Sequence, residues 1–396
     1  MPTKDTLITL DIGTTKTCAV VAKYSGPNKQ WNILGIGLAG SAGIKKGQLV
    51  QPAQAMNSIQ LALNRAQQAA GTSAKQVILG LPMSVCQSFW NKQTLTFYDT
   101  RKIQADDINK LHKKLSEVKL NKKICMIKAS LQSFVLDEKK ELYEPPVGQE
   151  THTLMGAGPL FYLDEAAALH WKQLLRSFAF DKIHFGIALE ALAWSIIPQA
   201  QRQAGVLLLD LGGGLVQLGL FQENKLKHAT YLPIAGNHLL ADIMYGVNVP
   251  AGEARRLLFE HGQAKGQASE DAMLTVLGNS GEERSQVSKE YFFKIITARV
   301  EEIFGFIQNK LTQWERESIV LPDTIYLGGA LSLLPGIADF TAKHLGRKVL
   351  LSDKQKNIVY QTAEGLLSVA GQALLPQPNL LNRSLLATRQ WLKEFA

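Results

Sequence analysis

The sequence predicts an α/β protein of two related halves, and two stretches carry this prediction. Residues 206–221 read VLLLDLGGGLVQLGLF, in which an apolar run enters an aspartate and three glycines and a second apolar run leaves. Residues 7–21 read LITLDIGTTKTCAVV and repeat the plan roughly 200 residues earlier. Apolar runs of this length, joined through glycine, are typical of buried strands in a tight hairpin. The repeated hairpin predicts two halves that close on one ligand.

Each predicted hairpin carries residues suited to binding a phosphate. Gly212–Gly214 remove every Cβ from the second turn, so that backbone N–H groups could close on a bulky anion. Asp210, at the end of the preceding strand, could hold a water molecule or a bound Mg²⁺. Asp11 and Gly13 take the same places in the first hairpin. A glycine-rich hairpin without a ligand is the alternative for either motif alone.

The rest of the first half follows an α/β pattern. Apolar residues at helical spacing, followed by Gly71, predict a helix over 51–70. A strand over 31–40 precedes this helix, and a buried strand over 77–81, closed by Pro82, follows it. Strand, helix and strand in this order indicate an α/β unit.

The pattern changes after Pro82 and predicts a small α+β insertion. Short strands over 93–97 and 125–136 flank a charged helix over 106–118. The chain then returns to the first half with a helix over 165–178, a strand over 182–186 and an apolar helix over 188–197.

The second half is predicted to contain a long amphipathic helix over 290–311. Its apolar face consists of Phe293, Ile296, Val300, Ile303 and Ile307. The stretch 264–285 is polar and is predicted to be weakly structured. The other predicted elements are helices over 234–245, 250–262 and 363–373, strands over 324–327 and 348–351, and a helix that begins at Gly336.

Composition indicates a globular protein with an anionic partner. The 396 residues are 46% hydrophobic and 19% charged, and 43 basic against 34 acidic residues leave a net charge of +9. That charge favours an anionic lipid, a nucleotide or an acidic peptide. It is spread along the chain, so we expect no nucleic-acid interface.

Cysteine usage and hydropathy predict the compartment. Cys18, Cys86 and Cys125 lack metal-ligand spacing, which is typical of buried thiols in a reduced cytosol. No signal peptide is expected, because Lys4 and Asp5 precede a run that is too short. No segment approaches the roughly 20 apolar residues of a membrane span.

The last residues form a separate segment. Pro376 and Pro378 predict a stiff linker. A helical wheel of the segment that follows predicts an interfacial membrane helix, with a helix that docks on the body as the alternative. Leu386 falls on its polar side. The apolar face holds Leu381, Leu385, Thr388, Trp391, Leu392 and Phe395, and the opposite face holds Arg383, Arg389, Gln390, Lys393 and Glu394.

These motifs together resemble the actin/Hsp70/sugar-kinase superfamily and, within it, the FtsA family of bacterial cell-division proteins. The hairpins identify the superfamily, while the α+β insertion and the amphipathic tail narrow it to FtsA. The matching stretches are LDIGTTKTCAVV (10–21), GIKKGQLV (43–50), LDLGGG (209–214), LPIAGNHLLADI (232–243), EARRLLFEHG (253–262), YLGGALSLLPGI (326–337) and WLKEF (391–395).

The resemblance implies an actin-like, two-lobed fold of ribonuclease H-like halves with a small α+β insertion and a C-terminal amphipathic helix. It also implies domain bounds. The first lobe comprises 1–82 and 164–202, the insertion 83–163, the second lobe 203–240 and 320–375, its outer subdomain 241–319, the linker 376–382 and the membrane-targeting helix 383–396.

The resemblance further implies that ATP and Mg²⁺ bind between the lobes, with Asp11 and Asp210 holding the metal. The implied nucleotide-binding residues are Asp11, Gly13, Thr14, Thr15, Lys16, Asp210, Gly212, Gly213, Gly214, Gly236, Arg255, Gly328, Gly329 and Ala330. Of these, Gly13 to Lys16 and Gly212 to Gly214 would hold phosphates, and Gly328 to Ala330 would pack against the adenosine.

Some positions depart from the family pattern. Leu215 and Gln217 stand where relatives have a hydroxyl and a carboxylate, and Leu258 stands where they commonly have a lysine. These changes predict weakened nucleotide binding and at most a weak ATPase. Gln132 and Glu190 are candidates to activate a water molecule, by rough location.

The implied partners are the C-terminal peptide of the tubulin-like FtsZ, further copies of the chain in protofilaments, an anionic membrane surface and other division proteins. The FtsZ peptide would bind the subdomain over 245–312 near Lys294 and Arg299. Leu385, Trp391, Leu392 and Phe395 would enter the membrane. The expected location is the cytoplasmic face of the inner membrane at the division septum.

Two other functions stay open at this point. One is an active ATPase or phosphotransferase of the same superfamily, although the chain shows no recognisable substrate motif. The other is a type IV pilus assembly protein similar to PilM, a family that generally lacks a detachable amphipathic tail.

Overall fold

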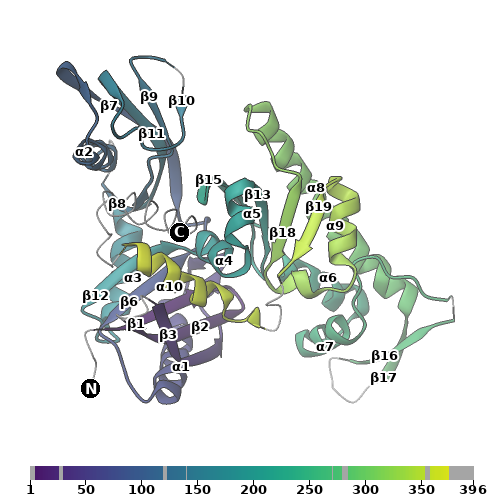
Figure 1. Cartoon of the computed structure of the whole chain (residues 1–396). Coiled ribbons are helices and arrows are strands. Elements are labelled where there is room, and N and C mark those ends of the chain that lie inside the picture. The colour runs from purple at the N-terminus through teal and green to yellow at the C-terminus, as the bar shows by residue number, and fades with distance from the viewer. Residues whose placement is uncertain are drawn as a thin grey trace, which may run out of the picture. The chain divides into compact units, whose positions relative to one another are not determined.

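The computed structural model describes residues 5–25, 30–118, 123–139, 141–269, 271–278, 284–352 and 357–373 (Figure 1). Its contacts divide the chain into two compact units. Unit 1 comprises Met1–Val85 and Leu174–Leu367, and unit 2 comprises Cys86–Gln173 and Ser368–Ala396. The domain bounds implied by the resemblance stay predictions.

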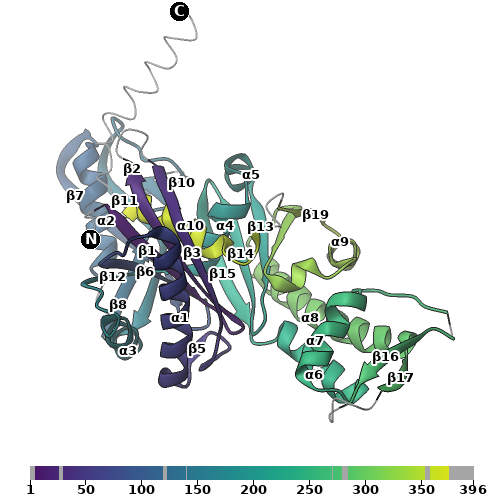
Figure 2. The ribbon, with the colours of Figure 1, turned by 90° about the horizontal axis from the view of Figure 1, so that it is seen from below.

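The first sheet of unit 1 has five strands in the order β12-β6-β1-β2-β3. The first hairpin is the antiparallel pair β1 and β2, and β6 runs parallel to β1. Helix α1 (Pro52–Ala70) covers β3, and Gly71 ends it in the left-handed conformation at φ 63° (Figure 2). The strands are β1 (Thr6–Ile12), β2 (Lys16–Ser25), β3 (Gln30–Gly40), β6 (Gln76–Leu81) and β12 (Lys182–Ile187), and the turn after β3 holds β4 (Ile44–Lys45) and β5 (Gln48–Leu49).

The second sheet of unit 1 repeats this arrangement in the order β19-β18-β13-β14-β15. The second hairpin is the antiparallel pair β13 and β14, and β18 runs parallel to β13 as β6 does to β1. The prediction of two related α/β halves is therefore confirmed. The strands are β13 (Val206–Leu211), β14 (Val216–Gln222), β15 (Lys225–Leu232), β18 (Thr324–Gly328) and β19 (Lys348–Leu351).

Helices complete both halves of unit 1. The predicted apolar face of the long helix α8 is buried against the second half, with Ile296, Val300 and Ile303 fully buried. The helices are α4 (Ala188–Ile196), α5 (Gln199–Ala204), α6 (Gly236–Val247), α7 (Ala251–His261), α8 (Lys289–Arg316), the 3₁₀ turn η1 (Ala330–Leu333), α9 (Ile337–Leu345) and α10 (Gln361–Ala373), of which residues 368–373 belong to unit 2.

One prediction in the second half is wrong. The polar stretch 264–285 contains β16 (Met273–Leu277) and the start of β17 (Arg284–Ser288), and these two strands pair. Leu274 and Val276 point inward from β16, while Met273 and Leu277 are exposed. Two inward side chains are enough to attach the hairpin to the core, but they are too few to stand out in a polar stretch.

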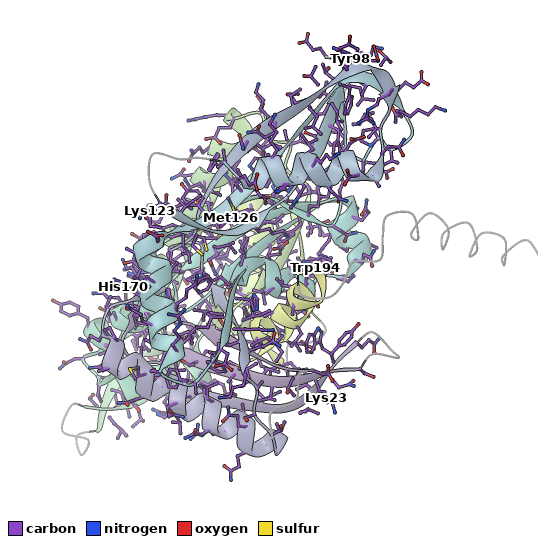
Figure 3. All side chains as sticks on the ribbon, turned by 90° about the vertical axis from the view of Figure 1, so that its left-hand side faces the viewer. Lys23, Tyr98, Lys123, Met126, His170 and Trp194 are labelled. Atoms are coloured by element: carbon purple, nitrogen blue, oxygen red, sulfur yellow. The ribbon has the colours of Figure 1, made fainter. Side chains whose placement is uncertain are left out.

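Unit 2 is built on a five-stranded antiparallel sheet. The predicted strand over 93–97 is part of the 16-residue β7, and the predicted strand over 125–136 is two strands, β8 and β9. Tyr98 points away from β7 and is 97% exposed (Figure 3). The elements are β7 (Gln87–Lys102), α2 (Ala105–Ser116), β8 (Ile124–Ala129), β9 (Ser133–Leu136), β10 (Glu141–Leu142), β11 (Glu150–Asp164) and α3 (Glu165–Arg176), whose last turn belongs to unit 1.

The cysteines are separate thiols. Cys18 and Cys86 are buried, and loss of solvent contact raises the pKa of each to about 12. Cys125 is only partly buried, so the prediction of three buried thiols is wrong for this residue.

Among the helices of the described ranges, none is long and apolar enough to span a membrane. The predicted linker and membrane helix, with Leu385, Trp391, Leu392 and Phe395, lie outside the described residues.

Candidate functional site

The tips of the two hairpins meet inside unit 1. A Cβ atom on Gly213 would lie 2.5 Å from Cγ2 of Thr15, and one on Gly214 would lie 2.3 Å from Oγ1 of Thr14. No side chain larger than hydrogen fits at either glycine without displacing these threonines. The glycines of the second hairpin are therefore required for the close approach of the first.

The turns leave a group of backbone donors open. The N–H of Gly13 donates to the carbonyl of Lys16 at 2.9 Å, and that of Gly212 donates to the carbonyl of Leu215 at 3.0 Å. Between these closures, four backbone N–H groups donate to no other described residue. Open N–H groups on turns are the usual cradle for an anion. They belong to Thr14, Thr15, Gly213 and Gly214.

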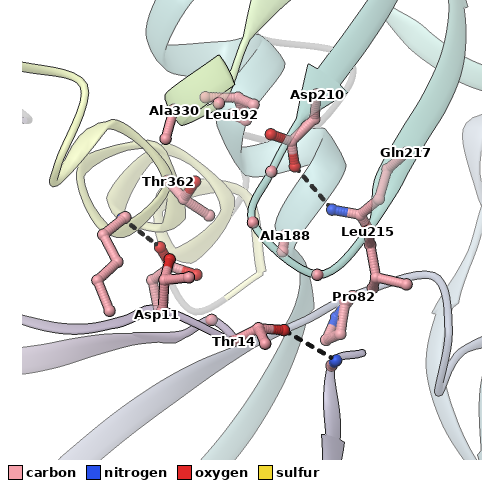
Figure 4. A pocket seen from close by; sticks show the side chains of 18 of the residues that line it. Asp11, Thr14, Pro82, Ala188, Leu192, Asp210, Leu215, Gln217, Ala330 and Thr362 are labelled. Atoms are coloured by element: carbon pink, nitrogen blue, oxygen red, sulfur yellow. Dashed lines mark hydrogen bonds and ion pairs between the residues drawn. The ribbon is translucent and has the colours of Figure 1, made fainter. Parts of the chain in front are cut away.

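A cavity of about 180 Å³ lies between the hairpins (Figure 4). Both hairpins line it, together with Gly47, Gly80 and Pro82 from the first half and Gly329 and Ala330 from the second. The wall is completed by Ile12, Ala188, Leu192, Ile358, Val359 and Thr362.

The carboxylate of the first hairpin is paired with a lysine. Lys16 Nζ lies 2.8 Å from Oδ2 of Asp11 and donates to the carbonyl of Val359 at 2.6 Å. Burial alone would lower the pKa of Lys16, but the charge of Asp11 and its hydrogen bond with Lys16 outweigh burial and raise that pKa. Lys16 is therefore a charged ammonium on the cavity wall.

The carboxylate of the second hairpin is paired with an amide. Gln217 lies directly opposite Asp210 in the β13–β14 ladder, and its Nε2 donates to Oδ2 of Asp210 at 2.8 Å. Figure 4 shows the two side chains pointing toward one another. Loss of solvent contact raises the pKa of Asp210 to about 6, despite the hydrogen bond from Gln217.

The other residues predicted to bind the nucleotide do not all line the cavity. Gly329 and Ala330 line the cavity, and Gly236 adjoins it by donating its N–H to the carbonyl of Gly212 at 3.1 Å. Gly328, at the end of β18, faces Leu192 of the cavity wall. Arg255 is exposed on α7 and does not line the cavity.

Leu258 also stays away from the cavity. Its Cδ1 atom lies beside Gly262, and its side chain packs on the core of the second half. Of the two candidates for activating water, Glu190 is buried on α4 without lining the cavity, and Gln132 belongs to unit 2.

The residues present fit the phosphates of the implied nucleotide better than its base or its metal. The open N–H groups and Lys16 match a phosphate, but about 180 Å³ is below the roughly 300 Å³ of common small-molecule pockets. Asp11 and Asp210 face the cavity, each with one oxygen already bonded to the protein. Within the described residues, no cluster of three or more His, Cys, Asp or Glu side chains could hold a metal.

The predicted peptide-binding residues lie on α8. Arg299 borders a groove of about 510 Å³ between α6 and α8, with the 92% exposed Tyr245 beside it. The Nε and Nη2 groups of Arg299 donate to Oδ2 and Oδ1 of Asp242, at 2.5 and 2.9 Å. The guanidinium of Arg299 also forms an ion pair with Glu302. The other residues of this α6–α8 groove are Gly246, Ile295 and Ala298.

Lys294 lies in a neighbouring groove of about 580 Å³, also on α8. Its Nζ is 2.6 Å from Oε1 of Glu290. The structure therefore brings Lys294 and Arg299 to one helix, in two different grooves and each in an ion pair.

Some lining residues were not singled out from the sequence. Val359 and Thr362 come to the cavity from a distant part of the chain, and no local motif marks them. Gly47 lies in the matching stretch over 43–50 and Pro82 closes a predicted strand, but neither position by itself indicates a cavity. Tyr245 could have been found, because an aromatic residue on the polar side of an amphipathic helix is a signal by itself.

The sequence of the chain is similar to those of known cell-division proteins. The sequence model of the family described as "Cell division protein FtsA" matches residues 207–368. The cell division protein FtsA of Pseudomonas aeruginosa is 24% identical over 91% of this chain and 88% of its own length. That of Bacillus subtilis (strain 168) is 25% identical over 93% of this chain and 84% of its own length.

The chain is similar to FtsA proteins over nearly its whole length, at low identity. The FtsA of Escherichia coli (strain K12), at 22% identity over 91% of this chain and 89% of its own length, shows how far the sequences have diverged. The likeness to FtsA proteins over nearly the whole chain supports a role in cell division.

Solved structures show the fold. A chain of the PilM–PilN type IV pilus biogenesis complex matches with a TM-score of 0.59 and 14% identity, over 93% of this chain and 99% of that one. MreB 5 of Spiroplasma citri bound to AMPPNP matches with a TM-score of 0.57 and 13% identity, over 94% and 98%. The actin-like, two-lobed fold implied by the FtsA resemblance is therefore confirmed.

Proposed function

We propose that the chain is an actin-like cell-division adaptor that binds ATP, assembles into protofilaments and ties FtsZ filaments to the cytoplasmic membrane at the division site. The observation that carries this proposal is the likeness to FtsA proteins over nearly the whole chain. The paired hairpins, with four open N–H groups and Lys16, support the ATP part. Solved neighbours bound to AMPPNP or ADP, and a MamK double helical filament, support nucleotide binding and self-assembly on this fold.

The nucleotide is proposed as a structural ligand. The chain's own residues would bind its phosphates through the N–H groups of both turns and through Lys16, and Gly329 and Ala330 would lie beside the adenosine. Mg²⁺, if it accompanies the nucleotide, would be held near Asp11 and Asp210. The carboxylates on the cavity wall, Asp11 and Asp210, each have one oxygen bonded to a neighbouring side chain, so we propose at most a weak ATPase.

The FtsZ peptide is proposed to bind on α8, in the α6–α8 groove. Tyr245 offers an exposed aromatic ring, and two hydrogen bonds to Asp242 hold Arg299. Glu302, which is half exposed, is the carboxylate that an acidic peptide would replace on Arg299. Lys294 would add attraction from the neighbouring groove.

Membrane attachment is proposed for the amphipathic segment predicted from the sequence over 383–396. A single helix of this length binds lipid only marginally, so assembly into filaments would raise residence on the membrane by avidity. Anionic lipid would add roughly 1 kcal/mol for each Lys or Arg close to the surface.

Co-sedimentation with anionic vesicles tests this function. We expect the full chain to pellet with vesicles and to bring FtsZ with it. The double variant Trp391→Glu/Phe395→Glu should stay in the supernatant, because charge on the apolar face opposes insertion. Leu386→Glu, on the predicted polar face, is the matched control and should pellet like the wild type. Wild-type protein that stays off the vesicles would contradict membrane attachment.

Co-sedimentation and an ATP-turnover assay together separate the alternatives. The PilM–PilN match shows the fold alone and gives no reason to prefer a pilus function. A chain that neither pellets nor binds FtsZ would favour a protein similar to PilM. Steady ATP turnover that Asp210→Ala abolishes would favour an active ATPase or phosphotransferase.

A further inference from the structure

One side chain joins the second hairpin to the first half of unit 1. Gln217 lies on β14 with 5% of its surface exposed. Its Nε2 donates to Asp210, and its Oε1 accepts the backbone N–H of Met83 at 2.8 Å. Met83 follows Pro82, directly after β6 of the first sheet. The amide of Gln217 is therefore a bridge between the two halves.

The bridge closes a cluster of contacts around the cavity. Leu215, on the same hairpin, is buried, and a Cβ on Gly47 of the first half would lie 3.0 Å from its Cδ1. Thr14 and Thr15 of the first hairpin touch the glycines of the second. The described protein atoms thus hold the hairpins together by themselves.

We propose that Gln217 is a positioning residue that sets the two hairpins for phosphate binding without a divalent cation. The inference rests on the proposed ATP site and concerns what holds that site in shape. A carboxylate at this position would repel the Asp210 carboxylate unless a cation or a shared proton lay between the two. A neutral amide both donates to Asp210 and accepts from Met83, so it makes the same bridge unaided.

The positive partners of a phosphate at this site also come from the protein. Lys16 supplies a full charge, and the two turns supply four backbone N–H groups. One oxygen of Asp11 is bonded to Lys16 and one of Asp210 to Gln217, which removes ligand positions from both carboxylates. A metal ion therefore has less to add here than in a site with free carboxylates.

Calorimetric titration of the full chain with ATP, in Mg²⁺ or in EDTA, tests this inference. We expect the wild-type dissociation constant to agree within about twofold between the two conditions. Gln217→Glu should bind ATP at least about tenfold more weakly in EDTA, since it places a second carboxylate beside Asp210 and the phosphates, and Mg²⁺ should restore binding. Gln222→Glu, the same change at the exposed end of β14, is the matched control and should behave as the wild type.

Each other outcome has a definite meaning. Wild-type binding that requires Mg²⁺ would overturn this inference and leave the proposed function standing. Wild-type protein that binds no ATP in either condition would overturn both the inference and the nucleotide part of the proposed function.

A second measurement decides the matter if Gln217→Glu does not fold. Hydrogen exchange of the wild-type protein without nucleotide or Mg²⁺ reports on the bridge directly, because the Met83 amide hydrogen is bonded to Gln217. A protected Met83 amide supports the inference. Exchange at the rate of an open peptide would overturn it.

Discussion

At the scale of single residues, the two hairpin aspartates have equivalent places and different partners. Asp11 lies opposite Cys18 and Gly80 on its neighbouring strands, and Asp210 lies opposite Gln217 and Gly328. Asp11 is neutralised by Lys16, whereas Asp210 has a neutral amide as its hydrogen-bond partner. Charge compensation is therefore unequal, and Asp210 carries the cost of desolvation.

The raised pKa of Asp210 predicts how stability depends on pH. The folded state binds a proton at Asp210 up to about pH 6, whereas the unfolded chain releases it near 3.8. The free energy of unfolding should therefore fall between about pH 4 and pH 6, by roughly 2 kcal/mol, and stay low above that range. Asp210→Asn, which keeps an acceptor for Gln217, should be more stable than the wild type at pH 8 and equal to it near pH 4.

Urea denaturation at pH 4.5 and pH 8 measures this difference. Asp323→Asn, at an exposed carboxylate before β18, is the control and should change the midpoint by little at either pH. A midpoint of Asp210→Asn that follows the wild type at both pH values would contradict the prediction.

At the scale of elements, α10 is attached to the first half by contacts distant in sequence. The hydroxyl of Thr9 on β1 donates to the carbonyl of Ala363 at 2.7 Å, and that of Ser195 donates to Glu364 at 2.8 Å. Gly365 allows α10 to lie directly on α4, because a Cβ there would be 1.7 Å from the carbonyl oxygen of Ala191. The close approach of these two helices depends on this glycine.

Gly365→Ala should destabilise the protein although alanine is the better helix former. The new methyl group must push α10 from α4, and overpacking of this kind costs about 1–3 kcal/mol. Gly305→Ala in α8 is the matched control. Apart from its chain neighbours and the backbone of its own helix, no described atom lies within 4 Å of its added methyl group, so it should stabilise by about 0.5–1 kcal/mol. Thermal unfolding of both variants measures the difference, and a stabilised Gly365→Ala would contradict the close packing.

Elements with a regular apolar period could be predicted from the sequence better than elements with a mixed exposed face. The helix over 51–70, the strand over 77–81 and the buried face of α8 were predicted well, because each has a regular apolar period and a clear end. The strand β7 was predicted at a third of its length, since its exposed side carries Trp90 and Tyr98 beside polar residues. Such a mixed face hides the alternation.

At the scale of the whole molecule, an adaptor needs two separate surfaces. The proposed FtsZ surface is the α6–α8 groove, and the proposed membrane surface is the segment over 383–396. Substitutions on one surface should leave the other intact, since the groove residue Tyr245 is 92% exposed and contributes little to the core.

Tyr245→Ala should therefore weaken the binding of FtsZ and leave membrane binding unchanged. We expect its affinity for the FtsZ C-terminal peptide to fall about tenfold, because exposed aromatic anchors carry much of the energy of such interfaces. Pelleting with vesicles and the melting temperature should stay at the wild-type values. Phe259→Ala, an exposed aromatic residue on α7 outside the groove, is the control for peptide binding. Unchanged peptide affinity of Tyr245→Ala would contradict the proposed position of this site.

The sequence by itself determined the paired hairpins, the two α/β halves and most helices, because strand and helix periods are local properties of the chain. Only the tertiary structure decided which groups face the cavity. Gln217 meets Met83 from 134 residues away, and Lys16 meets Val359 from 343 residues away. It also decided that Arg255 lies apart from the cavity, and that Lys294 and Arg299 are each paired with a carboxylate. Such contacts arise when separate elements pack, and no spacing along the chain encodes them.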